Sequence, residues 1–537
     1  MHKLLEDSPG KEMLLLGNEA IARGAIEAGI GLASCYPGTP SSEIPDTFFT
    51  LYQEAGFYFE YSTNEKVALE VAAGAAVSGV RSIVTMKHVG MNVASDALMT
   101  MAYLGVNAGM VVINADDPFL FSSQNEQDNR YYARLSGLPM IEPVNAQEMK
   151  DMTIAAFDIS EQLKLPVILR TTTRLNHLRG AVKFGPKREI KAKGFFKKDP
   201  FHYVAIPAVS RKLHKLLLEK YNQAWELSED SEYNQIIGNG PWGIVTNGVS
   251  MNYVQDAVKD LGIGEKVTIL RLGFSHPMPE RMIEKFLSSV ENVLVVEELE
   301  PVMENEIRSI AQSEGIGIPI KGKGDGLFPR LYEYDPGMVR KTIASYFGVS
   351  DATPVMVDMS EVPELPGRPP NLCAGCPHRA MYYAIKQVYG PEAIYPSDIG
   401  CYTLGVLPPL SMADIVICMG GSVGSSCGFT AATDQKVVAF IGDSTFFHAG
   451  IPALVNAVHN NHDFTLVILD NGTTAMTGHQ PHPGVDTTPM GVDTKTLSIE
   501  SLVRGLGVEH VEVVLSLIHI SEPTRPLYIS YAVFCLK

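Results

Sequence analysis

Two short turns toward the C-terminus carry the side chains best suited to chemistry. One turn ends an apolar run with Gly442, Asp443 and Ser444. The other ends the next apolar run with Asn471, which Thr473 follows. Because parallel strands joined by a right-handed crossover end at the same edge of a sheet, we expect the two turns to lie together. The Asp443 carboxylate, the Asn471 side chain and the Thr473 carbonyl would then offer the oxygen ligands that Mg²⁺ prefers.

The same turns predict a diphosphate ligand. Gly442 lets the backbone approach phosphate oxygens, and the helix predicted after Ser444 points its positive N-terminus at them. Gly-Asp alone or Asn-Gly alone is common in an ordinary turn. Together, with Asn471 about 28 residues after Asp443, they have the spacing of the thiamine diphosphate motif. We therefore predict thiamine diphosphate and Mg²⁺ as cofactors.

Further motifs make most of the chain, from residue 10 to about 513, resemble the alpha subunits of the indolepyruvate:ferredoxin oxidoreductases. This family belongs to the thiamine-diphosphate-dependent 2-oxoacid:ferredoxin oxidoreductases. The motifs are YPGTPSSE at 36–43, NEKVA at 64–68, LCAGCPHR at 372–379 and DIGCY at 398–402. The resemblance implies a pyrimidine-binding domain, a transketolase C-terminal-like domain and a diphosphate-binding domain, with the cofactor between the first and the third.

Two residues of the N-terminal motifs are candidate catalytic residues. The cofactor's aminopyrimidine deprotonates the thiazolium once a carboxylate holds its N1′ protonated. Glu65 matches the family's catalytic glutamate, although a helix dipole alone favours an acid in a first turn. Thr39 offers a hydroxyl for a 2-oxoacid carboxylate, although its loop also reads as a turn with a helix cap. Weaker candidates in later loops are Lys87, His88, Asn92, Asn125 and Arg130.

Three cysteines allow two interpretations. Cys373, Cys376 and Cys401 resemble the proximal cluster ligands of pyruvate-type relatives, but a [4Fe-4S] cluster usually takes four thiolates. Cys418 and Cys427 are the further thiols nearby. The other interpretation is that the cysteine loop shapes the diphosphate pocket, with Cys376, His378, Gly400 and Cys401 near the cofactor.

Alternating strands and helices must position these residues. Apolar runs such as 82–88, 109–118 and 166–175 alternate with small-residue helices, which predicts a parallel sheet covered on both faces. Strands are also expected at 242–250, 267–273, 292–299, 415–420, 437–443 and 464–470, with a helix at 209–227. The predicted fold class is therefore α/β: a thiamine-diphosphate-binding fold with two doubly wound parallel-sheet domains and a smaller transketolase C-terminal-like α/β domain between them.

The predicted domains follow from these elements and from the resemblance. They are a pyrimidine-binding domain at 1–180, a linker at 181–240, a transketolase C-terminal-like domain at 241–350, an incomplete diphosphate-binding domain at 365–514, and a tail at 515–537. The tail shows no helix or strand pattern and resembles a translated sequencing adapter, so we expect it to be artefactual. The family continues into a module with two C-x-x-C-x-x-C-x-x-x-C-P runs, and we therefore expect [4Fe-4S] clusters in the full-length protein.

Composition narrows the function classes. With 537 residues and 45% hydrophobic residues, the chain is a multidomain globular protein. A formal charge of −17 argues against nucleic acid or an anionic membrane as the main partner. No apolar run reaches the length of a bilayer span, and the acidic N-terminus does not read as a secretory signal, which predicts a cytoplasmic protein. Seven cysteines are too few for a disulfide scaffold.

The resemblance implies one reaction and its partners. The expected activity is CoA-dependent oxidative decarboxylation of arylpyruvates, such as indolepyruvate, to aryl-acetyl-CoA with reduction of ferredoxin. The expected partners are a second (beta) subunit, ferredoxin, CoA and the 2-oxoacid substrate. Two alternatives stay open: a non-redox thiamine-diphosphate-dependent 2-oxoacid decarboxylase, and a non-catalytic assembly subunit that keeps the fold.

Overall fold

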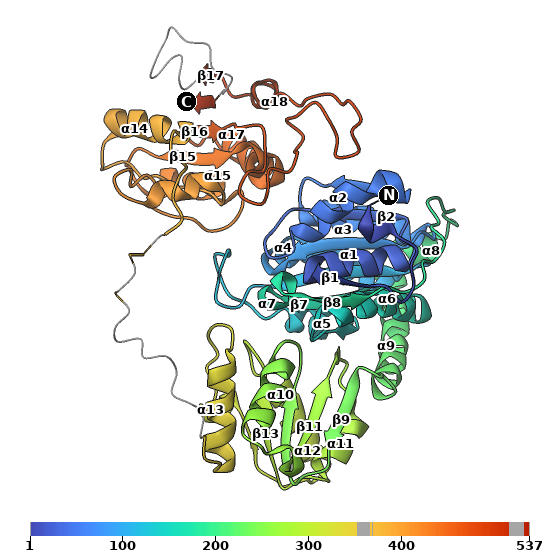
Figure 1. Cartoon of the computed structure of the whole chain (residues 1–537). Coiled ribbons are helices and arrows are strands. Elements are labelled where there is room, and N and C mark those ends of the chain that lie inside the picture. The colour runs from blue at the N-terminus through green and yellow to red at the C-terminus, as the bar shows by residue number, and fades with distance from the viewer. Residues whose placement is uncertain (1, 352–362, 364–365, 368, 515–530, 536–537) are drawn as a thin grey trace. The chain divides into compact units, whose positions relative to one another are not determined.

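The computed structural model describes residues 2–351, 363, 366–367 and 369–514, and the backbone of 531–535 (Figure 1). The chain divides into two compact units. The N-terminal unit comprises residues 1–60 and 65–358, and the C-terminal unit comprises residues 61–64 and 359–537. Each unit has its own sheets and its own hydrophobic core.

A seven-stranded sheet organises the first part of the N-terminal unit. Its strand order is β12-β6-β7-β5-β4-β2-β3. The pairs β2–β4, β4–β5, β5–β7 and β6–β7 are parallel, as predicted, and the short β12 pairs antiparallel with β6. The strands are β2 (Leu32–Cys35), β3 (Tyr58–Tyr61), β4 (Ser82–Lys87), β5 (Met110–Asp116), β6 (Met140–Ile141), β7 (Val167–Thr172) and β12 (Phe274–His276).

Helices with small buried residues cover this sheet. Every residue of β5 and β7 is buried, as expected for parallel strands enclosed on both faces. In α3 the alanines at 68, 72, 73 and 76 are buried in the core, which lets the helix lie close to its neighbours. The helices are α1 (Gly17–Glu27), α2 (Glu43–Ala55), α3 (Glu65–Val77), α4 (His88–Leu104), α5 (Arg130–Ser136), α6 (Ala146–Leu163) and α7 (Thr173–His177). The first strand, β1 (Glu12–Leu16), instead pairs antiparallel with β8 (Arg179–Lys183) in a separate two-stranded sheet.

A five-stranded sheet forms the second part of the N-terminal unit. Its order is β14-β13-β10-β11-β9, and the central pairs β10–β11 and β10–β13 are parallel. Its strands are β9 (Asn234–Gly238), β10 (Trp242–Thr246), β11 (Val267–Leu272), β13 (Asn292–Val296) and β14 (Ile320–Lys321). The strands predicted in this region and the helix predicted before it are confirmed. The main helices are α9 (Pro207–Glu229), α10 (Ser250–Asp260), α11 (Glu280–Leu287), α12 (Val302–Ser313) and α13 (Pro336–Phe347).

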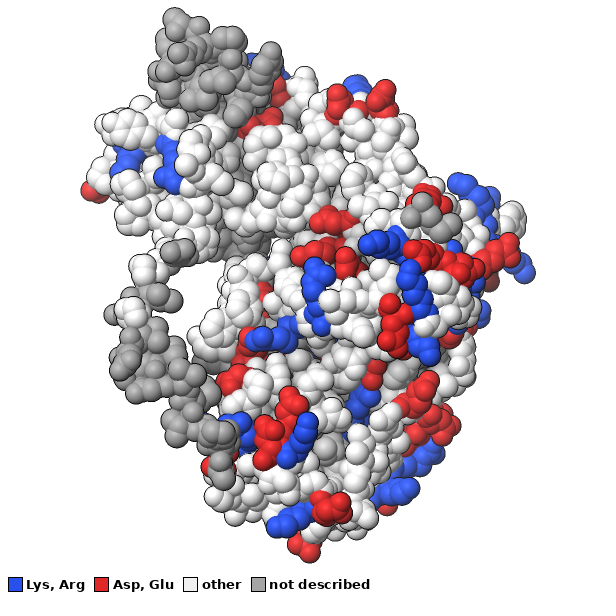
Figure 2. Space-filling model, in the orientation of Figure 1, with Lys and Arg blue, Asp and Glu red and all other residues white. Residues whose placement is uncertain are grey.

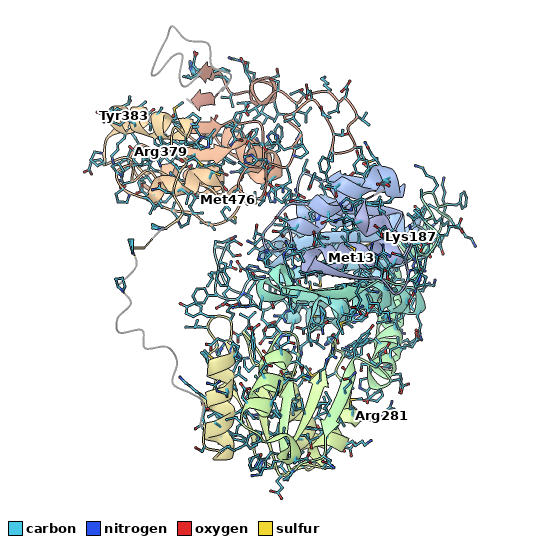
Figure 3. The ribbon with its side chains drawn as sticks, in the orientation of Figure 1. Met13, Lys187, Arg281, Arg379, Tyr383 and Met476 are labelled. Atoms are coloured by element: carbon cyan, nitrogen blue, oxygen red, sulfur yellow. The ribbon has the colours of Figure 1, made fainter. Side chains whose placement is uncertain are left out.

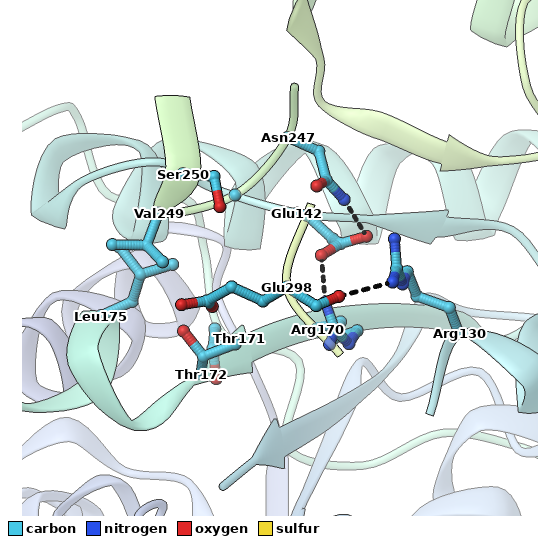
Figure 4. Close-up of a pocket in the computed structure, with 11 residues that line it drawn as sticks. Arg130, Glu142, Arg170, Thr171, Thr172, Leu175, Asn247, Val249, Ser250 and Glu298 are labelled. Carbon is cyan, nitrogen blue, oxygen red and sulfur yellow. Dashed lines mark hydrogen bonds and ion pairs between the residues drawn. The ribbon is translucent and has the colours of Figure 1, made fainter. Parts of the chain in front are cut away.

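Buried ion pairs connect the two sheets of this unit (Figure 4). Arg170 in β7 donates to Glu142, and Nδ2 of Asn247, after β10, donates to the same carboxylate at 3.0 Å. Arg130 donates to the Glu297 carboxylate at 2.6 Å, directly after β13. The side chains of Arg130, Glu142, Arg170 and Asn247 line a cavity with room for about one water molecule, roughly 10 Å³. The polar link fixes the carboxyl ends of β7, β10 and β13 relative to one another.

The C-terminal unit contains a four-stranded sheet of order β15-β16-β18-β17. β15 (Val438–Gly442) and β16 (Thr465–Leu469) are parallel, as predicted. β18 (Tyr531–Cys535) lies antiparallel between β16 and β17 (His510–Val514). The helices include α14 (Pro377–Tyr389), α15 (Gly421–Ala432), α16 (Asp443–Thr445), α17 (Ile451–His459) and α18 (Ile499–Gly505).

Two predictions for this unit are wrong. The run 415–420 is not a strand, because it pairs only through an isolated bridge between Ile415 and Pro396, and Ile417 is exposed. The predicted tail contains one strand, β18, although no strand was expected there. The remaining tail residues, 515–530 and 536–537, lie outside the described residues, and their artefactual origin stays a prediction.

Within the described part of the chain, every helix is too short or too polar to cross a bilayer. On the face shown in Figure 2, Lys and Arg side chains of the N-terminal unit are interspersed with Asp and Glu. Opposite charges at such spacing weaken each other's fields. This face is therefore not specialised for a ligand of one charge.

Candidate active site

Asp443 is the centre of the predicted metal and diphosphate site. It follows β15, and its side chain is only 3% exposed. Its Oδ2 accepts hydrogen bonds from the backbone N–H groups of Asn471 at 3.1 Å and Gly472 at 2.8 Å, which follow β16. The two turns therefore converge at one sheet edge, as the sequence predicts. Gly472 has a φ of 69°, a conformation that favours glycine and turns both N–H groups toward the carboxylate.

The electrostatics of this edge favour an ionised Asp443. Burial opposes ionisation, yet the hydrogen bond and charge of His482 hold the pKa of Asp443 below its usual value. The distance from His482 Nε2 to Asp443 Oδ2 is 2.9 Å. Burial and the neighbouring Asp443 raise the pKa of Asp470 to about 6. The Asp443 carboxylate is therefore ionised at neutral pH, and Asp470 adds further negative charge as the pH rises above about 6.

The residues present fit a hard divalent cation. Asp443 supplies a buried carboxylate, and the neighbouring loop supplies the amide oxygen of Asn471 and the carbonyl of Thr473. Asn471 Oδ1 here accepts a hydrogen bond from the Thr473 N–H at 3.2 Å. A cation that binds Asp443 Oδ2 must displace His482 from that oxygen. Ser444, the remaining predicted residue of this motif, lies beside the loop because the Thr474 hydroxyl donates to its Oγ at 2.8 Å.

Tyr402 explains two of the predicted glycines. A Cβ built on Gly442 would lie 2.4 Å from the Tyr402 ring, and one on Gly400 would lie 2.5 Å from it. The Tyr402 hydroxyl donates to the Ile399 carbonyl at 2.6 Å, which fixes the ring between both glycines. The glycines therefore accommodate a packed aromatic ring. Tyr402 belongs to the DIGCY motif, but no role was predicted for it, since its contact with Gly442 joins residues far apart in the chain.

His378 and Asp398 are also buried in this unit. Burial lowers the pKa of His378 to about 4, while the nearby Asp443 charge acts in the opposite direction. His378 is therefore neutral at neutral pH and lies within the electrostatic range of Asp443. Burial raises the pKa of Asp398 to about 6, and its carboxylate accepts N–H bonds from Gly420 at 2.8 Å and Ser422 at 2.9 Å.

The cysteines lie near one another without forming a metal site in the described structure. Burial raises the pKa of Cys401, with smaller contributions from Cys376 and Cys373. Arg379 on α14, which Figure 3 labels, donates from Nε to the Cys373 carbonyl at 3.1 Å and so fixes this loop. Among the described residues, no group of three or more His, Cys, Asp or Glu side chains is arranged to hold a metal ion. Both interpretations of the cysteine loop therefore stay predictions.

Glu65 begins α3 and is buried in the N-terminal unit, at 5% exposure. Its carboxylate lies against Gly90 in the first turn of α4. A Cβ on Gly90 would lie 2.7 Å from both Cγ and Oε1 of Glu65. The absence of a side chain at residue 90 therefore makes the space that the Glu65 carboxylate occupies.

Thr39 lies in a loop beside polar groups that follow β4 and β5. The Ser122 hydroxyl donates to the Thr39 carbonyl at 3.0 Å, and Lys87 Nζ donates to the Ser122 carbonyl at 2.9 Å. Burial lowers the pKa of Lys87 to about 8 against the opposing charges of Asp117 and Glu65. Within the described residues, the Thr39 hydroxyl makes no hydrogen bond. The structure therefore gathers Thr39, Lys87, Ser122 and Asp117 at the carboxyl edge of the seven-stranded sheet, and Ser122 and Asp117 were not predicted.

The weaker candidates have structural partners. His88 Nε2 lies 3.0 Å from the Asn125 carbonyl, and Asn92 donates to Gln127 at 3.0 Å. Burial lowers the pKa of His88. Arg130 is paired with Asp128 at 2.5 Å within the buried ion network. Its guanidinium is thus committed to fixing the fold, which argues against the predicted contact with a ligand.

Family models match both regions that carry these residues. Residues 23–223 match the thiamine-diphosphate-binding domain of pyruvate flavodoxin/ferredoxin oxidoreductases. Residues 398–522 match the C-terminal TPP-binding domain of thiamine pyrophosphate enzymes. Both descriptions support the prediction of thiamine diphosphate as the cofactor.

Relatives cover nearly the whole chain. It is 52% identical to the indolepyruvate oxidoreductase subunit IorA of Methanothermobacter marburgensis, over 95% of this chain and 83% of the relative. The chain belongs to the indolepyruvate oxidoreductase subunit IorA family. The IorA of Thermococcus kodakarensis is 46% identical over 95% of this chain and 82% of its own length. The resemblance inferred from the motifs is therefore confirmed.

A solved structure supports the fold. The 2-oxoglutarate:ferredoxin oxidoreductase from Magnetococcus marinus aligns with 62% of this chain and 65% of its own chain, at a TM-score of 0.52 and 16% identity. Together with the two matched families, this likeness confirms the predicted α/β thiamine-diphosphate-binding fold class.

Proposed function

We propose that this chain is the thiamine-diphosphate-binding catalytic subunit of an enzyme that oxidatively decarboxylates arylpyruvates, indolepyruvate among them. The products are the aryl-acetyl-CoA, CO₂ and reduced ferredoxin. The observation that carries the proposal is the convergence of Asn471 and Gly472 on Asp443 at the ends of β15 and β16. The names of the relatives, indolepyruvate oxidoreductase subunits, support the choice of substrate.

In the N-terminal unit, Glu65 is the proposed catalytic carboxylate. The cofactor, when bound, would supply a nucleophilic carbon and an electron sink for the charge left by decarboxylation. The Glu65 carboxylate would hold the proton on the pyrimidine N1′ that this chemistry requires. The Thr39 hydroxyl donates a hydrogen bond to the substrate carboxylate, and Lys87 adds positive charge at the same sheet edge.

In the C-terminal unit, Asp443, Asn471 and Thr473 are the proposed Mg²⁺ ligands. Gly442 and Ser444 line the diphosphate side of the same turn. His378, which burial keeps neutral, and the loop through Cys376, Gly400 and Cys401 shape the pocket around the cofactor. The domain limits that we propose are those predicted from the sequence, with the pyrimidine-binding domain at 1–180 and the diphosphate-binding domain at 365–514.

The proposed enzyme requires partners. A second (beta) subunit completes it, CoA accepts the acyl group, and ferredoxin accepts the electrons one at a time through [4Fe-4S] clusters. We also propose a cytoplasmic location.

The direct test is an anaerobic assay of the complex formed with the second subunit. The substrates are indolepyruvate and CoA, and the acceptor is ferredoxin. We expect reduction of ferredoxin that requires CoA and that Glu65→Gln abolishes. Decarboxylation without ferredoxin reduction would instead favour the non-redox alternative. A complex that binds no thiamine diphosphate would favour the assembly-subunit alternative.

A further inference from the structure

Three exposed aromatic residues of the N-terminal unit form a cluster that the proposed mechanism leaves unused. Phe119 and Phe121 lie in the loop after β5, and Tyr332 lies in the segment before α13. The ring centroids of Phe119 and Phe121 are 5.0 Å apart, and those of Phe119 and Tyr332 are 4.7 Å apart. Their exposed fractions are 49%, 56% and 45%. A contiguous aromatic surface of this kind is costly to leave in water and is typical of a recognition site.

The backbone around this aromatic cluster is held in an unfavourable conformation. Phe119 and Tyr332 have φ values of 75° and 70°, which non-glycine residues rarely adopt. The Glu126 carboxylate fixes both segments, because it accepts the N–H of Phe119 at 2.7 Å and the N–H of Tyr332 at 3.1 Å. Such conformations persist where the surroundings impose them, and they cluster at binding sites. The rings are thus presented by a rigid support rather than by a free loop.

The cluster is connected directly to the proposed substrate loop. Phe121 precedes Ser122, whose hydroxyl donates to the Thr39 carbonyl at 3.0 Å. The Ser122 carbonyl accepts from Lys87 Nζ at 2.9 Å. Phe121 is thus the chain neighbour of the residue that holds the Thr39 loop, so the aromatic cluster and the proposed carboxylate site belong to one connected set of loops.

We propose that Phe119, Phe121 and Tyr332 form the specificity surface that receives the aryl side chain of the substrate. This inference rests on the proposed function and deepens it. Aromatic rings prefer offset or edge-to-face contacts with one another, so the cluster favours aryl side chains over aliphatic ones of similar length. The substrate's carboxylate is recognised at Thr39 and its aryl ring at the cluster.

The test compares substrates rather than absolute rates. The complete complex is prepared with Phe121→Ala, with Phe121→Leu, and with Phe201→Ala as the control, since Phe201 is 84% exposed and belongs to α8 (Pro200–Tyr203) of the same unit. The kcat/KM is measured for indolepyruvate and for 4-methyl-2-oxopentanoate, and the binding of unreactive indole-3-propionate is measured by titration calorimetry. We expect Phe121→Ala to lower kcat/KM for indolepyruvate by roughly 3- to 10-fold, the range of an aromatic pair. The value for 4-methyl-2-oxopentanoate should change less than about 2-fold.

The outcomes separate this inference from the proposed function. Binding of indole-3-propionate should weaken in parallel, Phe121→Leu should have an intermediate effect, and Phe201→Ala should have none. Equal losses for both substrates, or no loss for indolepyruvate, would overturn the inference alone. A wild-type complex that turned over the aliphatic 2-oxoacid but no arylpyruvate would overturn both the inference and the proposed substrate.

Discussion

The substitution Gly90→Ala tests whether the position of the Glu65 carboxylate matters. Gly90 lies in the first turn of α4, and its missing side chain leaves room for Glu65. The new Cβ would lie 2.7 Å from both Cγ and Oε1 of Glu65. Since carbon atoms in good contact lie about 3.5–4.0 Å apart, the carboxylate must move by roughly 1 Å.

A displacement of this size has two separable effects. Misplacing a catalytic group by about 1 Å can lower the rate about 100-fold. Overpacking lowers the free energy of unfolding by about 1–3 kcal/mol, and the higher helix propensity of alanine offsets up to about 1 kcal/mol of this loss. We therefore expect kcat/KM to fall by about 10- to 100-fold while the protein stays folded.

The assay measures ferredoxin reduction by the complete complex, together with the melting temperature of each variant. Gly74→Ala is the matched control, because Gly74 lies in α3, the helix that begins with Glu65, and a Cβ there meets nothing within 4 Å. This control should keep full activity and gain up to about 1 kcal/mol of stability. A folded Gly90→Ala variant with wild-type kcat/KM would refute the assignment of Glu65 as the catalytic carboxylate.

Three further predictions follow from the geometry. Burial raises the pKa of Glu298 from 4.5 to about 7. Between these pH values the folded protein therefore keeps a proton that the unfolded chain releases. The free energy of unfolding should thus fall by up to about 3 kcal/mol as the pH rises from 4.5 to 7. Glu298→Gln should remove this fall in urea titrations between those pH values, and an unchanged pH dependence would contradict it. Gly442→Ala should displace the Tyr402 ring and weaken thiamine diphosphate binding at least about 10-fold by calorimetry, so unaltered binding would argue against the packed turn. Under the pocket-shaping interpretation, Cys401→Ala should leave the iron content after anaerobic reconstitution unchanged, whereas a loss of iron would favour the cluster interpretation.

The parts of the fold that could be predicted are those set by local patterns. The runs that became β15 and β16 are continuous and apolar, and their shared edge follows from the handedness of the crossover. The meeting of Asp443 with Asn471 and Gly472 was therefore predictable without coordinates.

The parts that could not be predicted depend on contacts between distant residues. Nothing near His482 in the sequence indicates that its ring reaches Asp443, 39 residues away. Likewise, Gly90 reads as an ordinary helical glycine until Glu65 packs against it. The strand β12 joins the seven-stranded sheet through only two residues of β6, too short a pairing for a pattern to predict.

The central claim, that Asp443 anchors Mg²⁺ and thiamine diphosphate, is tested most directly by calorimetric titration. Thiamine diphosphate with Mg²⁺ is titrated into the anaerobically purified chain, into Asp443→Asn, and into Asp434→Asn as an exposed control in the same unit. We predict binding to the wild-type chain and to Asp434→Asn, and binding to Asp443→Asn weakened by more than about 10-fold, because the substitution removes the one ionised metal ligand. Equal affinity of Asp443→Asn and the wild-type chain would contradict the account.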